Sequence, residues 1–163
     1  MITVRTKKAK ILLMCSVTLM IGFLGYAKSL QGAAQTSVSG VAMVIDGDTL
    51  DLHDVRIRLE GIDAPEKGQV CQSGGQPSRC GHAAKEHLAR LLYGTLVRCD
   101  HIGTDKYDRI LATCFIGDTN LNALLVRTGN AVAYRRYSTE YVPHEHRARS
   151  DGLGLWVGEF QMP

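Results

Sequence analysis

The sequence predicts an α+β fold in this chain of 163 residues: a five-stranded Greek-key β-barrel of the OB type with about three helices. Short stretches in which apolar and polar residues alternate recur within residues 41–59 and 95–116, and such alternation is typical of half-buried strands. Apolar residues at helical spacing follow the third and the fifth of these stretches. Five strands with one inserted helix and two later helices fit this barrel, although the pattern alone also permits other α+β arrangements.

The first three strands are expected close together in the chain. Residues 41–52 alternate on both sides of Asp46-Gly47, a dipeptide that signals a hairpin turn. Residues 55–59 alternate again after a second turn, with apolar side chains on one face and Arg58 on the other. The third strand ends before Asp63-Ala64-Pro65, which is typical turn chemistry.

The middle of the chain predicts a loop, a helix and a hairpin. Residues 67–81 are rich in Gly, Gln and Ser, which predicts an irregular loop. Residues 82–92 have helical spacing and end before Gly94, a residue suited to a helix C-terminus. Residues 95–101 and 110–116 read as two strands around a polar loop.

The last third of the chain predicts two more helices. Thr119 or Asn120 can cap a helix that closes at Gly129. Pro143 suits the first turn of a final helix that ends near Asp151. We expect Trp156 to pack this tail against the body of the domain.

The N-terminal stretch has the composition of a targeting segment. It starts with cationic residues, continues with 17 uncharged residues from Ile11 to Ala27, and ends in small residues. We expect residues 1–34 to be a cleaved signal peptide or an N-terminal membrane anchor, residues 35–40 a linker, and residues 41–163 the folded domain. Either form of the leader predicts export, to the periplasm or the extracellular space, or anchoring with the domain outside the cytoplasm.

Net charge gives no support for nucleic-acid binding by the domain. The formal charge of the chain is +3, but five of its 19 basic residues lie in the leader, where there is no acidic residue. That leaves 14 basic residues against 16 acidic residues, so an anionic partner would have to be held by a local cluster.

Four cysteines follow the leader, and an even number in an exported domain is typical of disulfides. They lack the Cys-x-x-Cys spacing that zinc sites use, and they allow three pairings. We favour Cys71 with Cys80, which closes one polar loop, and Cys99 with Cys114, which could face each other across a hairpin.

Charged residues in the segment 44–66 are of the types that metal and phosphate sites use. Asp48 and Asp63, at the ends of adjacent strands, could share a hard cation with water and a backbone carbonyl, and composition does not separate calcium from magnesium. Arg58 and Arg109 could bind phosphate oxygens through their planar guanidinium groups, and Glu66 could orient or deprotonate a water molecule. Taken singly, each has a simpler explanation: the aspartates as turn residues, Arg58 as a solvated partner of Glu60, and Arg109 as a hairpin charge.

Three motifs together resemble the staphylococcal nuclease, or thermonuclease, family. They are Val-Ile-Asp-Gly-Asp-Thr at 44–49, Arg-Leu-x-Gly-Ile-Asp-Ala-Pro-Glu at 58–66 and Asp-Lys-Tyr-x-Arg at 105–109. The resemblance covers about Val41 to Trp156. It implies an OB-type barrel and a calcium-dependent hydrolase that acts on DNA and RNA and leaves 3′-phosphate ends. Apart from the resemblance, we expect a monomer, with membrane contact only through an uncleaved leader.

The resemblance also implies roles for single residues. It assigns metal binding to Asp48, Asp63 and the carbonyl of Ala64, catalysis to Arg58, Glu66 and Arg109, and nucleotide binding to Lys106, Tyr107 and Tyr134. The chain departs from the best-known member of the family at Ala64, where that member has threonine, at Asp108, where it has glycine, and in the cysteine-bearing loop.

The alternative is a non-catalytic OB-fold module that binds nucleic acid or protein. Such a module would be expected to lose some of the five charged residues of the implied metal and catalytic set. This chain keeps all of them, which favours the enzyme: Asp48, Arg58, Asp63, Glu66 and Arg109.

Overall fold

The structure is a computed structural model that describes residues 36–163. The expected signal peptide or anchor at residues 1–34 lies outside this range. Within residues 36–163, no helix is both long enough and apolar enough to cross a membrane.

The domain is built on one curled sheet. Its strands are β1 (Ser37–Val41), β2 (Met43–Val44), β3 (Thr49–Leu52), β4 (Val55–Leu59), β8 (Leu96–Thr104), β9 (Ile110–Ile116) and β10 (Thr119–Asn120). Their hydrogen-bonded order is β1-β8-β9-β4-β3-β2, and β10 pairs with β9. Since β1 and β2 form the two ends of this order and only Ala42 separates them in the chain, the sheet curls back on itself. With β1 and β2 taken as one bent strand, and with the two-residue β10 left aside, this is the predicted five-stranded α+β barrel.

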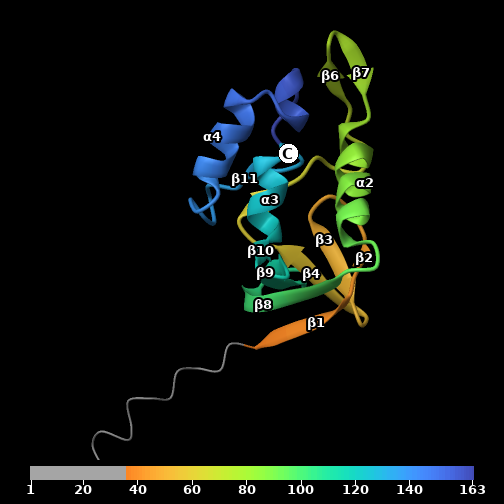
Figure 1. Ribbon diagram of the computed structural model, residues 1–163, viewed down its shortest axis with the longest axis vertical. Coiled ribbons are helices and arrows are strands. Elements are labelled where there is room, and N and C mark those ends of the chain that lie inside the picture. The colour runs from red at the N-terminus through yellow and green to blue at the C-terminus, as the bar shows by residue number, and fades with distance from the viewer. Residues whose placement is uncertain (1–35) are drawn as a thin grey trace, which may run out of the picture. The chain divides into compact units, whose positions relative to one another are not determined.

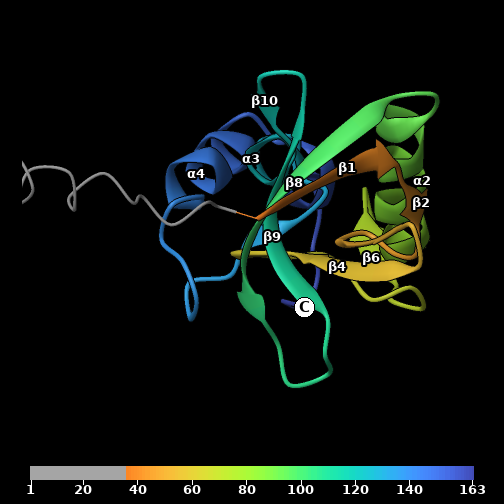
Figure 2. The ribbon, with the colours of Figure 1, turned by 90° about the horizontal axis from the view of Figure 1, so that it is seen from below.

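Strand pairing brings distant segments of the chain together. Neighbouring strands are antiparallel except β4 and β9, which run parallel with Arg58 opposite Leu111. The long β8–β9 hairpin carries residues 105–109 in a loop that projects beyond the sheet in Figure 2. A second small sheet pairs β5 (Ile62–Asp63) with β11 (Val132–Ala133).

Two predictions of irregular structure are wrong. Residues 37–40, expected to be part of a linker, belong to β1 because they pair with β8. The expected irregular loop at 67–81 contains a hairpin of β6 (Cys71–Ser73) and β7 (Gln76–Ser78), which stands at the N-terminal end of the long helix in Figure 1. Both segments have a composition that favours loops. In β1, hydrogen bonding to the distant strand β8 outweighs this composition, and in the β6–β7 hairpin, strand pairing next to the Cys71–Cys80 disulfide does so.

The three predicted helices are present, and Figure 1 shows them around the sheet. They are α2 (Cys80–Leu92), α3 (Leu121–Arg127) and α4 (Val142–Ser150), and a 3-10 turn η1 (Gly154–Val157) follows. Asn120 caps α3 as expected, because its side chain accepts a hydrogen bond from the Ala123 N–H at 3.0 Å. Pro143 lies in the first turn of α4, also as expected.

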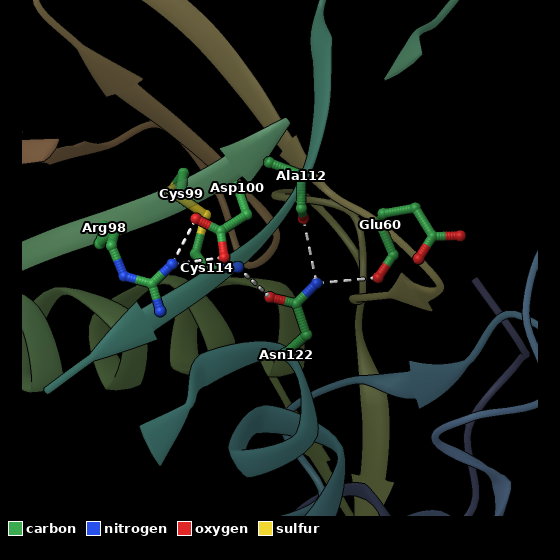
Figure 3. Close-up of a disulfide and its surroundings, with 7 residues drawn as sticks. All are labelled: Glu60, Arg98, Cys99, Asp100, Ala112, Cys114 and Asn122. Carbon is green, nitrogen blue, oxygen red and sulfur yellow. Dashed lines mark hydrogen bonds and ion pairs between the residues drawn. A yellow bond between two sulfur atoms is a disulfide. The ribbon is translucent and has the colours of Figure 1, made fainter. Parts of the chain in front are cut away.

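A buried amide joins α3 to the sheet, and a disulfide joins two neighbouring strands of that sheet (Figure 3). Asn122 is fully buried; its Nδ2 donates to the Glu60 and Ala112 carbonyls, and its Oδ1 accepts from the Cys114 N–H. Cys114 is directly opposite Cys99 across β8 and β9 and is bonded to it. The structure also joins Cys71 to Cys80, so both favoured pairings are confirmed.

Candidate active site

The turn before β3 presents a buried carboxylate. Asp46 accepts a hydrogen bond from the Asp48 N–H at 3.1 Å, which fixes the turn. Asp48 is only 3% exposed, and its Oδ2 accepts from the Ala64 N–H at 2.7 Å. This bond ties the first predicted metal ligand to the loop that carries the other two.

Arg58 connects the two predicted metal-binding aspartates. It lies on β4 opposite Thr49, and its guanidinium group pairs with Asp48 through Nη1 and with Asp63 Oδ1 through Nη2 at 2.5 Å. The alternative in which Glu60 balances Arg58 is therefore wrong. All three side chains are less than a fifth exposed, so this guanidinium group is held by two carboxylates in a largely buried setting.

Two glycines let neighbouring elements approach the 64–66 loop closely. A Cβ on Gly47 would lie 2.6 Å from the Ala64 Cβ, so the Asp46–Asp48 turn packs directly on this loop. A Cβ on Gly81, in the first turn of α2, would lie 1.7 Å from the Glu66 carbonyl oxygen. The position of Glu66 therefore depends on a helix that begins 14 residues later in the chain.

Replacement of Gly81 by alanine should destabilise the domain by about 1–3 kcal/mol, since the backbone of Glu66 must move to admit the methyl group. Helix propensity alone would predict that Gly81→Ala stabilises the domain, because alanine is favoured over glycine in a helix. Gly68→Ala is the matched control, as a Cβ there meets nothing within 4 Å. Thermal unfolding of both variants checks this; a Gly81→Ala melting temperature at or above the wild-type value would contradict it.

Arg109 is oriented by an acidic residue in its own loop. Its Nε donates to Asp105 Oδ2 at 2.7 Å, and Asp105 Oδ1 accepts from the Tyr107 and Arg109 N–H groups. Desolvation acts to raise the pKa of Asp105, but these hydrogen bonds outweigh it and lower that pKa. The ionised Asp105 therefore holds the Arg109 guanidinium group in place.

One polar cavity of about 140 Å³ brings together the two halves of the predicted site. Its lining residues are Asp46, Asp48, Arg58, Ala64, Pro65, Glu66 and Arg109. Five of the predicted metal and catalytic residues thus face one space, and the sixth, Asp63, contacts it through Arg58. Parallel pairing of β4 with β9 explains this, because Arg109 directly precedes the strand beside Arg58.

A wider groove of about 650 Å³ adjoins the cavity and shares Arg58 and Arg109 with it. The three residues predicted to bind nucleotide all line this groove: Lys106, Tyr107 and Tyr134. Tyr134 reaches it because its N–H donates to the Gly61 carbonyl at 2.9 Å, next to the β5–β11 pair. A hydrogen bond with Tyr107 raises the pKa of Lys106 above its ordinary value.

Several residues around the cavity and groove are missing from the sequence predictions. Asp46 fixes the position of Asp48, and Asp105 fixes the position of Arg109. In the sequence, only the location of Asp46 and Asp105 within turns could have indicated these roles. Tyr137 is 64% exposed and lines the groove beside Arg136. The grouping of two basic and two aromatic residues in Tyr-Arg-Arg-Tyr at 134–137 was the signal that could have indicated a nucleic-acid-binding surface.

The chemistry of the site suits a hard cation. Its donors are carboxylate and main-chain oxygens, the ligands that calcium prefers. Within residues 36–163, no cluster of three or more His, Cys, Asp or Glu side chains is arranged to hold a metal ion. A cation held by Asp48, Asp63 and the Ala64 carbonyl would therefore need water or substrate oxygens to complete its shell.

The fold and the site define a small barrel domain with a composite centre of carboxylates and arginines. The family model described as staphylococcal nuclease homologue matches residues 56–158. The chain belongs to this family.

Three relatives illustrate the similarity. The succinoglycan biosynthesis protein ExoI of Rhizobium meliloti (strain 1021) is 37% identical over 77% of this chain and 67% of its own length. An uncharacterized endonuclease of Haemophilus influenzae (strain ATCC 51907 / DSM 11121 / KW20 / Rd) is 35% identical over 72% of this chain and 65% of its own length. The micrococcal nuclease of Shigella flexneri is 34% identical over 71% of each chain. The similarity thus spans about two thirds of each relative.

Proposed function

We propose that the protein is a calcium-dependent phosphodiesterase that hydrolyses DNA and RNA and leaves 3′-phosphate ends. The observation that carries this proposal is the single cavity shared by Asp48, Arg58, Glu66 and Arg109. Relatives named micrococcal nuclease and endonuclease support the same class of hydrolase.

Arg58 and Arg109 are suited to bind the scissile phosphate. Both residues line the cavity and also the groove, so they lie where the two spaces meet. A phosphodiester gains negative charge on its non-bridging oxygens when a nucleophile adds, and fixed guanidinium groups stabilise that charge. Both guanidinium groups are held by ion pairs before substrate binds. Arg58 pairs with Asp48 and Asp63, and Arg109 pairs with Asp105.

Glu66 is suited to act on the attacking water. It lines the cavity and is exposed, and it takes part in none of the ion pairs found in residues 36–163. A general base must be able to reach the water and keep a free carboxylate. Among the carboxylates that line the cavity, Asp46 and Asp48 are held by hydrogen bonds, which leaves Glu66 for this role.

Asp48, Asp63 and the carbonyl of Ala64 are the groups that would hold calcium. Bound calcium would supply positive charge to polarise the phosphate. Arg58 keeps the two carboxylates beside one another, and the Ala64 N–H fixes the orientation of Asp48.

The groove is suited to the nucleotides that flank the scissile bond. Tyr107, Tyr134 and Tyr137 offer ring faces for stacking, and Lys106 and Arg136 offer positive charge for the backbone. This combination favours single-stranded segments, whose unpaired bases are free to stack.

We also propose that the protein is exported to the periplasm or the extracellular space, either free or anchored through residues 1–34, and that it acts as a monomer. Two disulfides in one small domain support export, because such bonds persist in oxidising compartments.

The test is cleavage of labelled single-stranded DNA and RNA of defined length, with calcium or with a chelator, followed by analysis of the product ends. We expect cleavage of both substrates in calcium, none in chelator, and 3′-phosphate ends. Binding of either substrate without cleavage in calcium would favour a non-catalytic binding module and would contradict the proposal.

A further inference from the structure

The turn that carries Glu66 is closed by one residue, Gln69. The Gln69 N–H donates to the Glu66 carbonyl at 2.8 Å, and the Gln69 Oε1 accepts from the Glu66 N–H at 3.1 Å. Both main-chain groups of Glu66 are thus bonded to the same residue. Gln69 itself does not line the cavity, so it does not contact the space where substrate would react.

The same amide reaches the end of the chain. Gln69 Nε2 donates to the Gln161 carbonyl at 2.8 Å, across 92 residues of sequence. A side-chain amide is at once donor and acceptor, which allows one group to make both bonds. Methionine has a similar length but can make neither bond.

The C-terminal segment is itself fixed against the β6–β7 hairpin. The Gln72 N–H donates to the Glu159 carbonyl at 2.7 Å. A Cβ on Gly158 would lie 1.8 Å from the Gln72 carbonyl oxygen, so the two backbones are in close contact. The Cys71–Cys80 disulfide joins this hairpin to the start of α2. Gln69 therefore connects the Glu66 turn to an anchored segment rather than to a loose end.

We propose that Gln69 is a positioning residue for Glu66 and that the C-terminal segment 159–161 takes part in catalysis through it. The inference rests on the proposed role of Glu66. It predicts that loss of the Gln69 side-chain bonds slows the chemical step and leaves substrate binding intact, since Gln69 lines neither the cavity nor the groove.

Steady-state cleavage by the full chain tests the inference with Gln69→Met. We expect kcat to fall about tenfold, with KM unchanged, because a small misplacement of a reacting group has effects of this order or larger. In the Glu66→Gln background the same substitution should have no further effect on kcat. Gln76→Met is the matched control, because Gln76 is exposed on β7 of the hairpin that follows Gln69 in the chain.

The C-terminal contact is tested by a second pair of variants. A chain that ends at Phe160 loses the acceptor carbonyl of residue 161 and should lower kcat in the same way. Gln161→Ala keeps that main-chain carbonyl and should behave as wild type. An equal fall of kcat for Gln69→Met in the wild-type and Glu66→Gln backgrounds, or no fall in the wild-type background, would overturn the inference.

Hydrogen exchange at the Glu66 amide separates this inference from the proposed function. We expect faster exchange in Gln69→Met and in the shortened chain, because both lose bonds that fix this turn. If wild type shows no cleavage in calcium, the proposed function fails, and exchange at Glu66 alone then decides whether Gln69 positions it. Unchanged exchange in both variants would overturn the positioning role.

Discussion

Replacement of Glu66 by glutamine should lower the rate of phosphodiester cleavage by about 10²–10⁴-fold, the usual contribution of a general base. Glutamine has nearly the same shape but cannot accept a proton from water at neutral pH. Because Glu66 is exposed and lies outside the ion pairs of residues 36–163, the melting temperature should not change. Single-turnover cleavage and thermal unfolding measure the two effects separately.

Glu86→Gln is the matched control for Glu66→Gln. Glu86 lies on the exposed face of α2, where it faces His82 and Arg90, and it does not line the cavity. Surface pairs of this kind contribute little to stability, so neither rate nor melting temperature should change. Wild-type activity in Glu66→Gln would remove Glu66 from the mechanism, even if cleavage by the protein itself is established.

Replacement of Arg58 by lysine should lower kcat/KM by about 10²–10³-fold and also destabilise the domain by about 1–3 kcal/mol. Lysine keeps the charge, but one ammonium group cannot reproduce a planar guanidinium that binds Asp48 through one nitrogen and Asp63 through the other. The substitution therefore weakens the phosphate contact and also leaves a largely buried carboxylate poorly paired. Cleavage kinetics and urea unfolding measure the two losses.

Arg56→Lys provides the control on the same strand. Arg56 lies two residues before Arg58 on β4 but is exposed, and it lines neither the cavity nor the groove. Both its kinetics and its stability should match wild type. If Arg58→Lys has the same cleavage kinetics and stability as Arg56→Lys, the contact of Arg58 with the two aspartates contributes to neither catalysis nor stability.

The parts of the fold that could be predicted from sequence depend on local chemistry. Alternation identified the long strands, Asn120 and Pro143 marked helix starts, and spacing gave the favoured disulfides. The linker at 35–40 shows the limit of this reasoning. Residues 37–40 of that linker favour no structure by themselves, and only pairing with β8 makes them part of a strand.

The candidate site could be predicted as a set of residues but not as an arrangement. Motifs supplied Asp48, Arg58, Asp63 and Arg109, yet the parallel pairing of β4 with β9 that joins them has no local signature. Tyr137 could not be assigned to the groove from sequence, because a single aromatic residue has the same pattern whether it packs in the core or lines a groove. The contact of Gln69 with Gln161 could not be predicted either, because no local pattern indicates a hydrogen bond between residues that are 92 positions apart.

The central claim is that one composite centre, held together by Arg58 and completed by Arg109, hydrolyses phosphodiesters. The most direct measurement is the calcium-dependent cleavage rate of one single-stranded substrate by wild type, Glu66→Gln, Arg58→Lys and Arg109→Lys, with Glu86→Gln and Arg56→Lys in parallel. We predict rapid cleavage by wild type and by both controls, and a loss of about 10²-fold or more in each of the other three. Equal rates in all six proteins, or no cleavage by wild type, would contradict the claim.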